Sequence, residues 1–99
     1  MPRVLFTESA HSDLLDAWLF IAQERLDAAD RVIDAIHQDA ITLSLQPLMG
    51  RLRVELAKGV RSWPTSTRYI LFYLPSVSGI TVLRVLHHAR GIQNIQIDI

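Results

Sequence analysis

Two apolar segments decide the fold: Thr67-Arg68-Tyr69-Ile70-Leu71-Phe72-Tyr73-Leu74 and Ile80-Thr81-Val82-Leu83-Arg84-Val85-Leu86-His87. Both are rich in β-branched and aromatic residues, which favour β-strands. The five residues between them, 75–79, contain a proline and end in a glycine, a composition typical of a hairpin connection. Because both segments are apolar on nearly both faces, we expect them to be the central strands of a sheet.

Shorter strand candidates, residues 3–6 and 59–64, lie further out on either side. Between them the apolar residues recur with helical spacing. One stripe runs from Thr7, a suitable N-cap, to about Arg25, and it includes Trp18, for which we expect a packing role. A second stripe begins at Asp27, another candidate N-cap, and ends at Gln46, because a proline follows. The short break between the two helices predicts an antiparallel helical hairpin.

The predicted fold is therefore α+β, with the order β-α-α-β-β-β and the helical hairpin packed on one face of a small antiparallel sheet. We expect a single domain over residues 1–99. The tail from Arg90 to Ile99 alternates isoleucine with polar residues, so it should dock either on its own sheet or on a partner.

The composition excludes several classes of protein. The chain has 99 residues, 49% of them hydrophobic, and no cysteine, which excludes disulfides, thiol nucleophiles and cysteine-ligated metals. The N-terminus does not resemble a signal peptide, and no run approaches the roughly 18 apolar residues of a membrane span. We expect a cytoplasmic protein with no membrane association and no cofactor.

The net charge is zero, but the charge is divided unequally. Residues 1–46 carry three basic against eight acidic side chains, a net charge of −5, and residues 47–99 carry seven against two, a net charge of +5. Either the two halves neutralise each other when packed, or the basic half binds an anionic partner such as nucleic acid or an acidic protein segment.

Six local strings, in this order and spacing, resemble the ParE toxins of the ParE/RelE toxin–antitoxin superfamily over essentially the whole chain. They occupy residues 14–22, 28–36, 46–51 (Gln-Pro-Leu-Met-Gly-Arg), 60–64 (Val-Arg-Ser-Trp-Pro), 68–73 (Arg-Tyr-Ile-Leu-Phe-Tyr) and 83–90 (Leu-Arg-Val-Leu-His-His-Ala-Arg). The resemblance implies the RelE/ParE-like fold and a bacterial toxin, of the kind that serves in plasmid stabilisation. It also implies a cognate antitoxin with a ribbon-helix-helix DNA-binding half and a segment that folds on the toxin, forming a hetero-oligomer.

Within that superfamily two activities must be distinguished. ParE-like members inhibit DNA gyrase, whereas RelE-like members cut messenger RNA on the ribosome. RNA cleavage needs an acid, a base and cations around one phosphate. The candidates for those roles are Arg61, Arg68, His87, His88 and Arg90. This set is incomplete against the RelE pattern, because no arginine occupies the central strand near Ile70 and no tyrosine follows Tyr73. We therefore expect a non-enzymatic gyrase inhibitor; the alternatives are an mRNA endonuclease and an inactive antitoxin-binding module.

The candidate binding residues form two groups. Arginines on an exposed sheet face, with one tryptophan beside them, should receive acidic residues of the antitoxin: Arg61, Trp63, Arg68 and Arg84. The start of the tail should face the target: His87, His88, Arg90 and Ile92. Arg84 is informative because a buried arginine needs either a paired carboxylate or an open face. Asp13 and Asp16 are expected on a solvated helix face, and no metal site is expected, because adjacent histidines on a strand point to opposite faces.

Overall fold

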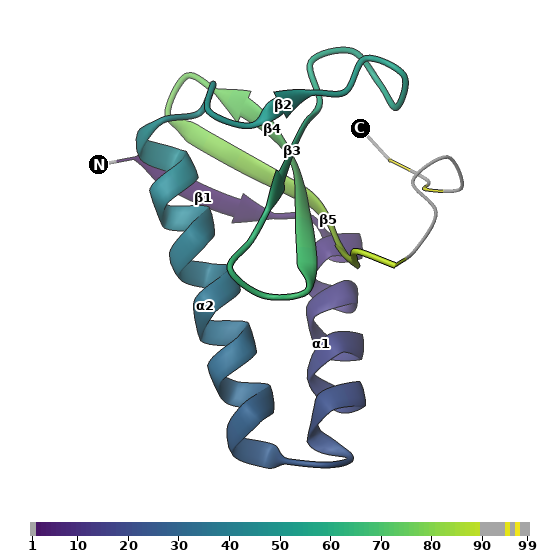
Figure 1. Cartoon of the computed structure of the whole chain (residues 1–99). Helices are drawn as coiled ribbons and strands as arrows, with labels where there is room; N and C mark the ends of the chain where they lie inside the picture. Colours follow the sequence, from purple (N-terminus) through teal and green to yellow (C-terminus); the bar gives the residue numbers. More distant parts are fainter. Residues whose placement is uncertain (1, 90–94, 96, 98–99) are drawn as a thin grey trace.

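The computed structural model describes residues 2–89 together with Ile95 and Ile97. Its elements are β1 (Arg3–Phe6), α1 (Glu8–Ala22), α2 (Leu26–Leu45), β2 (Arg51–Leu52), β3 (Arg61–Pro64), β4 (Tyr69–Ser76) and β5 (Gly79–His87). The two helices form a hairpin packed on a five-stranded sheet with the order β1-β5-β4-β3-β2 (Figure 1). The predicted α+β fold, with its helical hairpin followed by a meander of strands, is confirmed.

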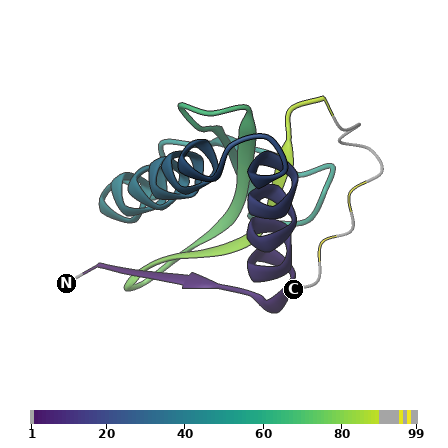
Figure 2. The same ribbon diagram turned by 90° about the horizontal axis from the view of Figure 1, so that it is seen from below.

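The sheet is mixed rather than wholly antiparallel. β1 pairs with β5 in parallel, from Arg3 opposite Gly79 to Phe6 opposite Val82, and Figure 2 shows the two strands running side by side. The other pairs are antiparallel, and the two-residue β2 adds an edge strand that the sequence did not predict. The β4–β5 hairpin is also tighter than expected, with only residues 77 and 78 between the strands.

The helix boundaries follow capping and proline effects. Thr7 caps α1 as predicted, since its side chain accepts a hydrogen bond from the Ala10 amide at 3.1 Å. The prediction for the start of α2 was wrong: Arg25 is the N-cap, and Asp27 lies in the first turn, where its carboxylate binds the Arg25 guanidinium at 2.9 Å. α2 ends at Leu45, with Gln46 as its C-cap, as the following proline predicts.

The main core lies between the helices and the sheet. The sheet contributes large side chains, including Leu71, Tyr73 and Val82, and the helices contribute Leu14 and Ile36 beside several alanines. Trp18 is not part of this core: it is half-buried, and its indole Nε1 donates a hydrogen bond to Asp30 Oδ1 at 2.8 Å, which ties α1 to α2.

A second core covers the opposite face of the central strands. It contains the buried side chains Val60, Phe72, Leu83 and Leu86. The loop between β2 and β3 packs against it, and so do Ile95 and Ile97 from the tail. The part of the tail that the structure describes therefore docks on the protein's own sheet.

Neither helix in the described part of the chain combines the length and the apolar composition needed to cross a lipid bilayer.

Candidate partner-binding groove

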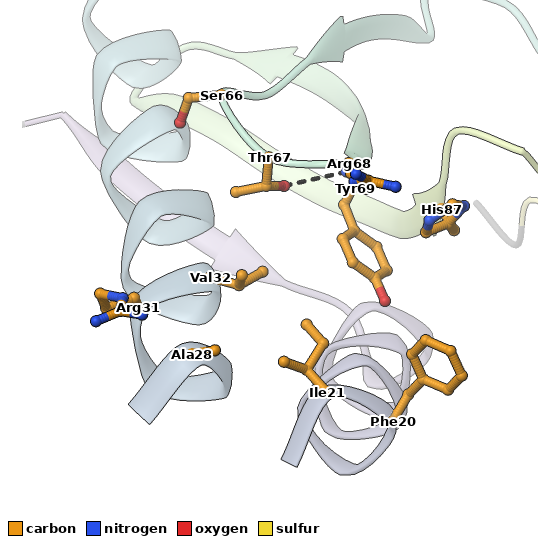
Figure 3. A pocket seen from close by; sticks show the side chains of 10 residues that line it. All are labelled: Phe20, Ile21, Ala28, Arg31, Val32, Ser66, Thr67, Arg68, Tyr69 and His87. Carbon is orange, nitrogen blue, oxygen red and sulfur yellow. Dashed lines mark hydrogen bonds between the residues drawn. The ribbon is translucent and has the colours of Figure 1, made fainter. Parts of the chain in front are cut away.

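A groove of about 630 Å³ opens between the helical hairpin and one end of the sheet (Figure 3). Its walls come from the end of α1, the start of α2, the turn between β3 and β4, and the end of β5. The lining residues are Phe20, Ile21, Ala28, Arg31, Val32, Ser66, Thr67, Arg68, Tyr69 and His87. The size is typical of ligand and peptide sites.

The turn between β3 and β4 is fixed by its own hydroxyl groups. Thr65 Oγ1 donates to the Tyr69 carbonyl oxygen at 2.7 Å, and Thr67 Oγ1 accepts from the Tyr69 amide at 3.0 Å. The Ser66 amide donates to Asp39 Oδ2 on α2 at 2.8 Å. Because the turn is bonded to itself and to the helix, Arg68 is presented from a rigid support.

Tyr69 stands in the middle of the groove. Its ring packs edge-to-face on His87, with the centroids 5.3 Å apart, and only 8% of the residue is exposed. Burial raises the pKa of its phenol, so the hydroxyl remains a proton donor at neutral pH. The hydroxyl points towards Phe20 and Ile21, and no described residue forms a hydrogen bond with it (Figure 3).

Two histidines stand at the end of β5. The rings of His87 and His88 stack with centroids 4.6 Å apart, and the His88 amide donates to the Arg68 carbonyl oxygen at 2.8 Å. Burial lowers the pKa of His87, and the positive charges of His88 and Arg68 lower it further. His87 is therefore neutral at pH 7, and its Nδ1 accepts a hydrogen bond from the Ala89 amide at 3.1 Å.

The structure brings some of the predicted site residues together and separates others. Arg68 and His87 line the groove, and His88 adjoins them. Trp63 is half-buried and packs against the main core instead. Arg90 and Ile92 lie outside the described residues.

Arg61 is held beside the middle of β4, away from the groove. It pairs with Tyr73 across the sheet, whereas Arg68 immediately precedes Tyr69, so about 13 Å of strand separates the two positions. The Arg61 Nη1 donates to the carbonyl oxygens of Gly50 at 2.7 Å and Leu48 at 3.3 Å. Arg61 therefore does not converge with Arg68, His87 and His88 on one site.

Arg84 has a paired carboxylate rather than an open face. Its guanidinium binds both oxygens of Asp13, at 2.7 and 3.0 Å, and the two side chains are 18% and 9% exposed. The expectation that Arg84 lies on an exposed sheet face was therefore wrong, and so was the prediction that Asp13 lies on a solvated helix face. Helical periodicity could not reveal this pair, because its partners are 71 residues apart.

Sequence reasoning missed most of the groove: Phe20, Ile21, Arg31, Val32 and Tyr69. One signal was present, since Phe20 is a large aromatic residue off the buried stripe of α1, and it is 66% exposed. Tyr69 gave no signal of its own, because an aromatic residue in an apolar strand is indistinguishable from core. Within the described residues, no cluster of three or more histidine and acidic side chains could hold a metal ion.

Comparison with known proteins identifies the family. No curated protein matches the chain in sequence. A solved structure described as the chromosomal ParDE TA system from P. aeruginosa has the same fold, with a TM-score of 0.72 and 18% sequence identity, over 88% of this chain and 96% of that chain. The model of the family described as the ParE toxin of the type II toxin–antitoxin system, parDE, matches residues 4–92. The chain therefore belongs to the ParE toxin family.

Proposed function

We propose that this protein arrests bacterial growth by inhibiting DNA gyrase and is held inactive by a cognate antitoxin in the cytoplasm. Membership of the ParE family supports the toxin role. The fold likeness to a protein from a ParDE system supports the existence of an antitoxin partner. The antitoxin that we propose has a ribbon-helix-helix DNA-binding half and a segment that folds on the toxin.

The observation that favours gyrase over messenger RNA is the separation of Arg61 from Arg68, His87 and His88. Cleavage at a ribose 2′-hydroxyl requires cations and proton-transfer groups within hydrogen-bond reach of one phosphate. Here the Arg61 guanidinium is engaged by the carbonyl oxygens of the loop after α2. Arg68 and His87 line a groove whose helical wall is apolar except for Arg31, an arrangement that suits a protein partner better than a scissile phosphate.

The proposal assigns the two partners to different parts of the molecule. Arg68 is the cation best placed for the antitoxin, because it is exposed and lines the groove. Arg61 and Trp63 could contribute only through a wider interface, and Arg84 already binds Asp13. The target-facing surface that we propose begins at His87 and His88 and continues through Arg90 and Ile92.

The decisive experiment expresses the protein without antitoxin in a bacterial host and measures two signals in the same culture. One is DNA double-strand breakage with induction of the SOS response, and the other is cleavage of a reporter message within translated codons. We expect breaks with intact message, and we expect co-expressed antitoxin to abolish them. The control is the same host treated with a gyrase inhibitor, which gives the level of DNA breakage expected when gyrase is fully inhibited.

Cleaved message before any DNA break would overturn the gyrase proposal in favour of the endonuclease. If folded protein produced neither signal, the chain would instead be an inactive module that only binds the antitoxin.

A further inference from the structure

The outer side of the helical hairpin, turned away from the sheet, exposes large apolar side chains. The buried stripe of α1 runs from Ala10 to Ala17 and faces the core. Leu15 and Leu19 lie one turn apart on the other side of α1, and Leu26 begins α2 beside the last turn of α1. All three are at least 50% exposed, and we call them the leucine strip. The outer side of a helix in a soluble protein is normally polar, so a strip of this kind indicates a contact surface.

A tryptophan beside the leucine strip is held in place by the second helix. Trp18 is half-buried, and its indole Nε1 donates a hydrogen bond to Asp30 Oδ1 at 2.8 Å. Because Trp18 lies between Leu15 and Leu19 in α1, this bond joins the two helices at the level of the strip. A fixed, partly exposed indole next to exposed leucines is typical of the centre of a protein interface, where tryptophan is enriched.

The neighbouring side of α2 is acidic. Asp30 and Asp34 are exposed and lie one turn apart, and they border the leucine strip because α1 and α2 run side by side (Figure 1). Neither carboxylate forms an ion pair with a described residue. Within the described part of the chain, one ion pair, Asp13 with Arg84, joins residues 1–46 to residues 47–99. The basic half of the chain therefore leaves the negative charge on the outer side of the hairpin uncompensated.

We propose that the outer side of the hairpin binds a basic amphipathic helix of a partner protein, with apolar side chains on the leucine strip and lysine or arginine side chains on Asp30 and Asp34. Leu15 and Leu19 are separated by about 6 Å of helix rise, and so are the two aspartates. A third helix whose own apolar and basic residues recur at one-turn intervals can therefore engage both rows at once.

This surface is distinct from the groove at the end of the sheet, because none of its residues lines that groove. The inference goes beyond the proposed toxin activity, and it requires only that the chain is folded.

The charges of the hairpin disfavour two other occupants. Together α1 and α2 carry seven acidic side chains, three in α1 and four in α2, and one basic side chain, Arg31. Two copies packed outer side to outer side would therefore bring like charges together. A nucleic acid would place its phosphates against the same carboxylates. A basic helix is the occupant whose charge complements this face.

The chain contains two tryptophans, which allows a direct test by fluorine NMR of protein labelled with 5-fluorotryptophan. The probe is a synthetic amphipathic helix of leucine and lysine. Trp18 reports on the proposed surface, and Trp63, which lies on β3 and packs against the main core, is the internal control. We expect the peptide to shift the Trp18 signal and to leave the Trp63 signal in place.

Two further peptides test what the surface recognises. One has the same leucines and lysines in scrambled order, so it keeps the charge but has no continuous apolar face. The other has glutamate in place of every lysine, so it keeps the apolar face but reverses the charge. We expect both to leave the Trp18 signal in place.

Substitutions test the two rows of the surface separately. The double variant Leu15→Gln, Leu19→Gln removes the apolar contact, and the double variant Asp30→Asn, Asp34→Asn removes the charge while keeping an acceptor for the indole. We expect each double variant to weaken peptide binding roughly tenfold or more. All four side chains are exposed, so the fold should be retained, which circular dichroism checks.

The matched controls lie outside the hairpin. Leu48→Gln replaces a leucine that is 70% exposed, and Glu55→Gln removes an exposed carboxylate from the loop after β2. Both should leave the affinity for the peptide unchanged.

Several results would overturn the inference. Equal binding of the scrambled or the glutamate peptide would show that neither an apolar face nor a positive charge is recognised. A Trp18 signal that does not move with saturating peptide, or an affinity that both double variants retain, would place the peptide elsewhere. A Trp18 shift caused by raising the toxin concentration alone, or by duplex DNA, would make a second copy or nucleic acid the occupant. None of these measurements depends on growth arrest, so the proposed function and this inference can fail separately.

Discussion

The Asp13 carboxylate binds Arg84 through both of its oxygens and also accepts the Val85 amide, with Oδ2 at 3.0 Å from the backbone nitrogen. The Val85 amide needs this acceptor because β1 ends opposite Val82. The rest of β5 therefore has no neighbouring strand on that side. The Leu83 carbonyl oxygen on the same edge of β5 accepts a hydrogen bond from the Thr7 hydroxyl at 2.9 Å. The first turns of α1 therefore complete the hydrogen bonding of this edge of the sheet.

We expect Asp13→Ala to destabilise the fold by about 2 to 4 kcal/mol, somewhat below the usual cost of breaking a fully buried ion pair because Arg84 is partly exposed. The substitution leaves the guanidinium without its carboxylate and the Val85 amide without its acceptor. Urea unfolding followed by circular dichroism measures the loss.

The matched control is Asp27→Ala, which removes an exposed carboxylate that also contacts arginine. Exposed pairs contribute little, so its unfolding midpoint should equal that of the wild type. Equal destabilisation by the two variants would contradict the structural role of Asp13.

A second buried contact fixes the loop after α2. The Tyr73 hydroxyl donates to the Pro47 carbonyl oxygen at 2.8 Å and accepts from the Gly50 amide at 2.9 Å. We expect Tyr73→Phe to lower the free energy of unfolding by about 1 to 3 kcal/mol, because it leaves a buried amide and a carbonyl unpaired. Thermal unfolding measures the effect.

A substitution at Gly50 tests the same contact between the loop and the Tyr73 hydroxyl. A Cβ at this position would meet the Tyr73 hydroxyl and would lie 2.9 Å from the Ser62 carbonyl oxygen, so Gly50→Ala should also destabilise the protein. At Gly59 an added Cβ has room, with its nearest contact at 3.4 Å, but the φ of +80° disfavours alanine there for a different reason. If Gly50→Ala were neutral, the close approach of Tyr73 to this loop would be wrong.

The sequence predicted the elements whose stability depends on local pattern. Helical periodicity, the Thr7 cap and the proline after Gln46 located both helices to within a few residues, and the β-branched and aromatic runs located β4 and β5. The parallel pairing of β1 with β5 could not be predicted in this way. A four-residue strand specifies its own extended conformation, but not which distant edge it will join or in which direction.

The candidate site was only partly predictable, for a similar reason. Arg68 and His87 were identified as exposed cationic and strand-end residues, but the opposite wall of their groove comes from the junction of the two helices, more than thirty residues earlier in the chain. Arg84 was recognised as a residue that needs a partner, and that partner, Asp13, could not be recognised from a helix pattern alone. Long-range charge pairing determined which arginine remained available for binding.

The environment of His87 predicts a pH dependence of stability. Burial and the neighbouring positive charges lower its pKa below the ordinary value of 6.5, which the unfolded chain regains. As the pH falls through about 6.5, the unfolded state binds a proton that the native state does not, so the native state loses stability. The stability that neutral His87 contributes is therefore fully present above pH 6.5 and declines below it.

Replacing His88 with alanine removes one of the charges that lower this pKa. We therefore expect the pKa of His87, measured by proton NMR of its ring, to rise in His88→Ala. The decrease in the free energy of unfolding at acidic pH should then become smaller. Arg51→Gln, at the far edge of the sheet, is the control and should leave the midpoint in place. A downward movement in His88→Ala would contradict the electrostatic account.

The role of Arg61 separates the two candidate activities most directly. As a loop-fixing residue, Arg61 donates to the carbonyl oxygens of Leu48 and Gly50, and its replacement by glutamine should cost about 1 kcal/mol of stability. As a nuclease cation it would stabilise charge on the scissile phosphate, and the same replacement would reduce activity a hundredfold or more. We expect Arg61→Gln to unfold at a slightly lower temperature and still to arrest growth when it is induced well below that temperature. The opposite result would be loss of growth arrest in folded Arg61→Gln, with the message no longer cut. It would require Arg61 to reach the other basic groups, although the pairing of β3 with β4 places Arg61 opposite Tyr73, four residues along the strand from Tyr69.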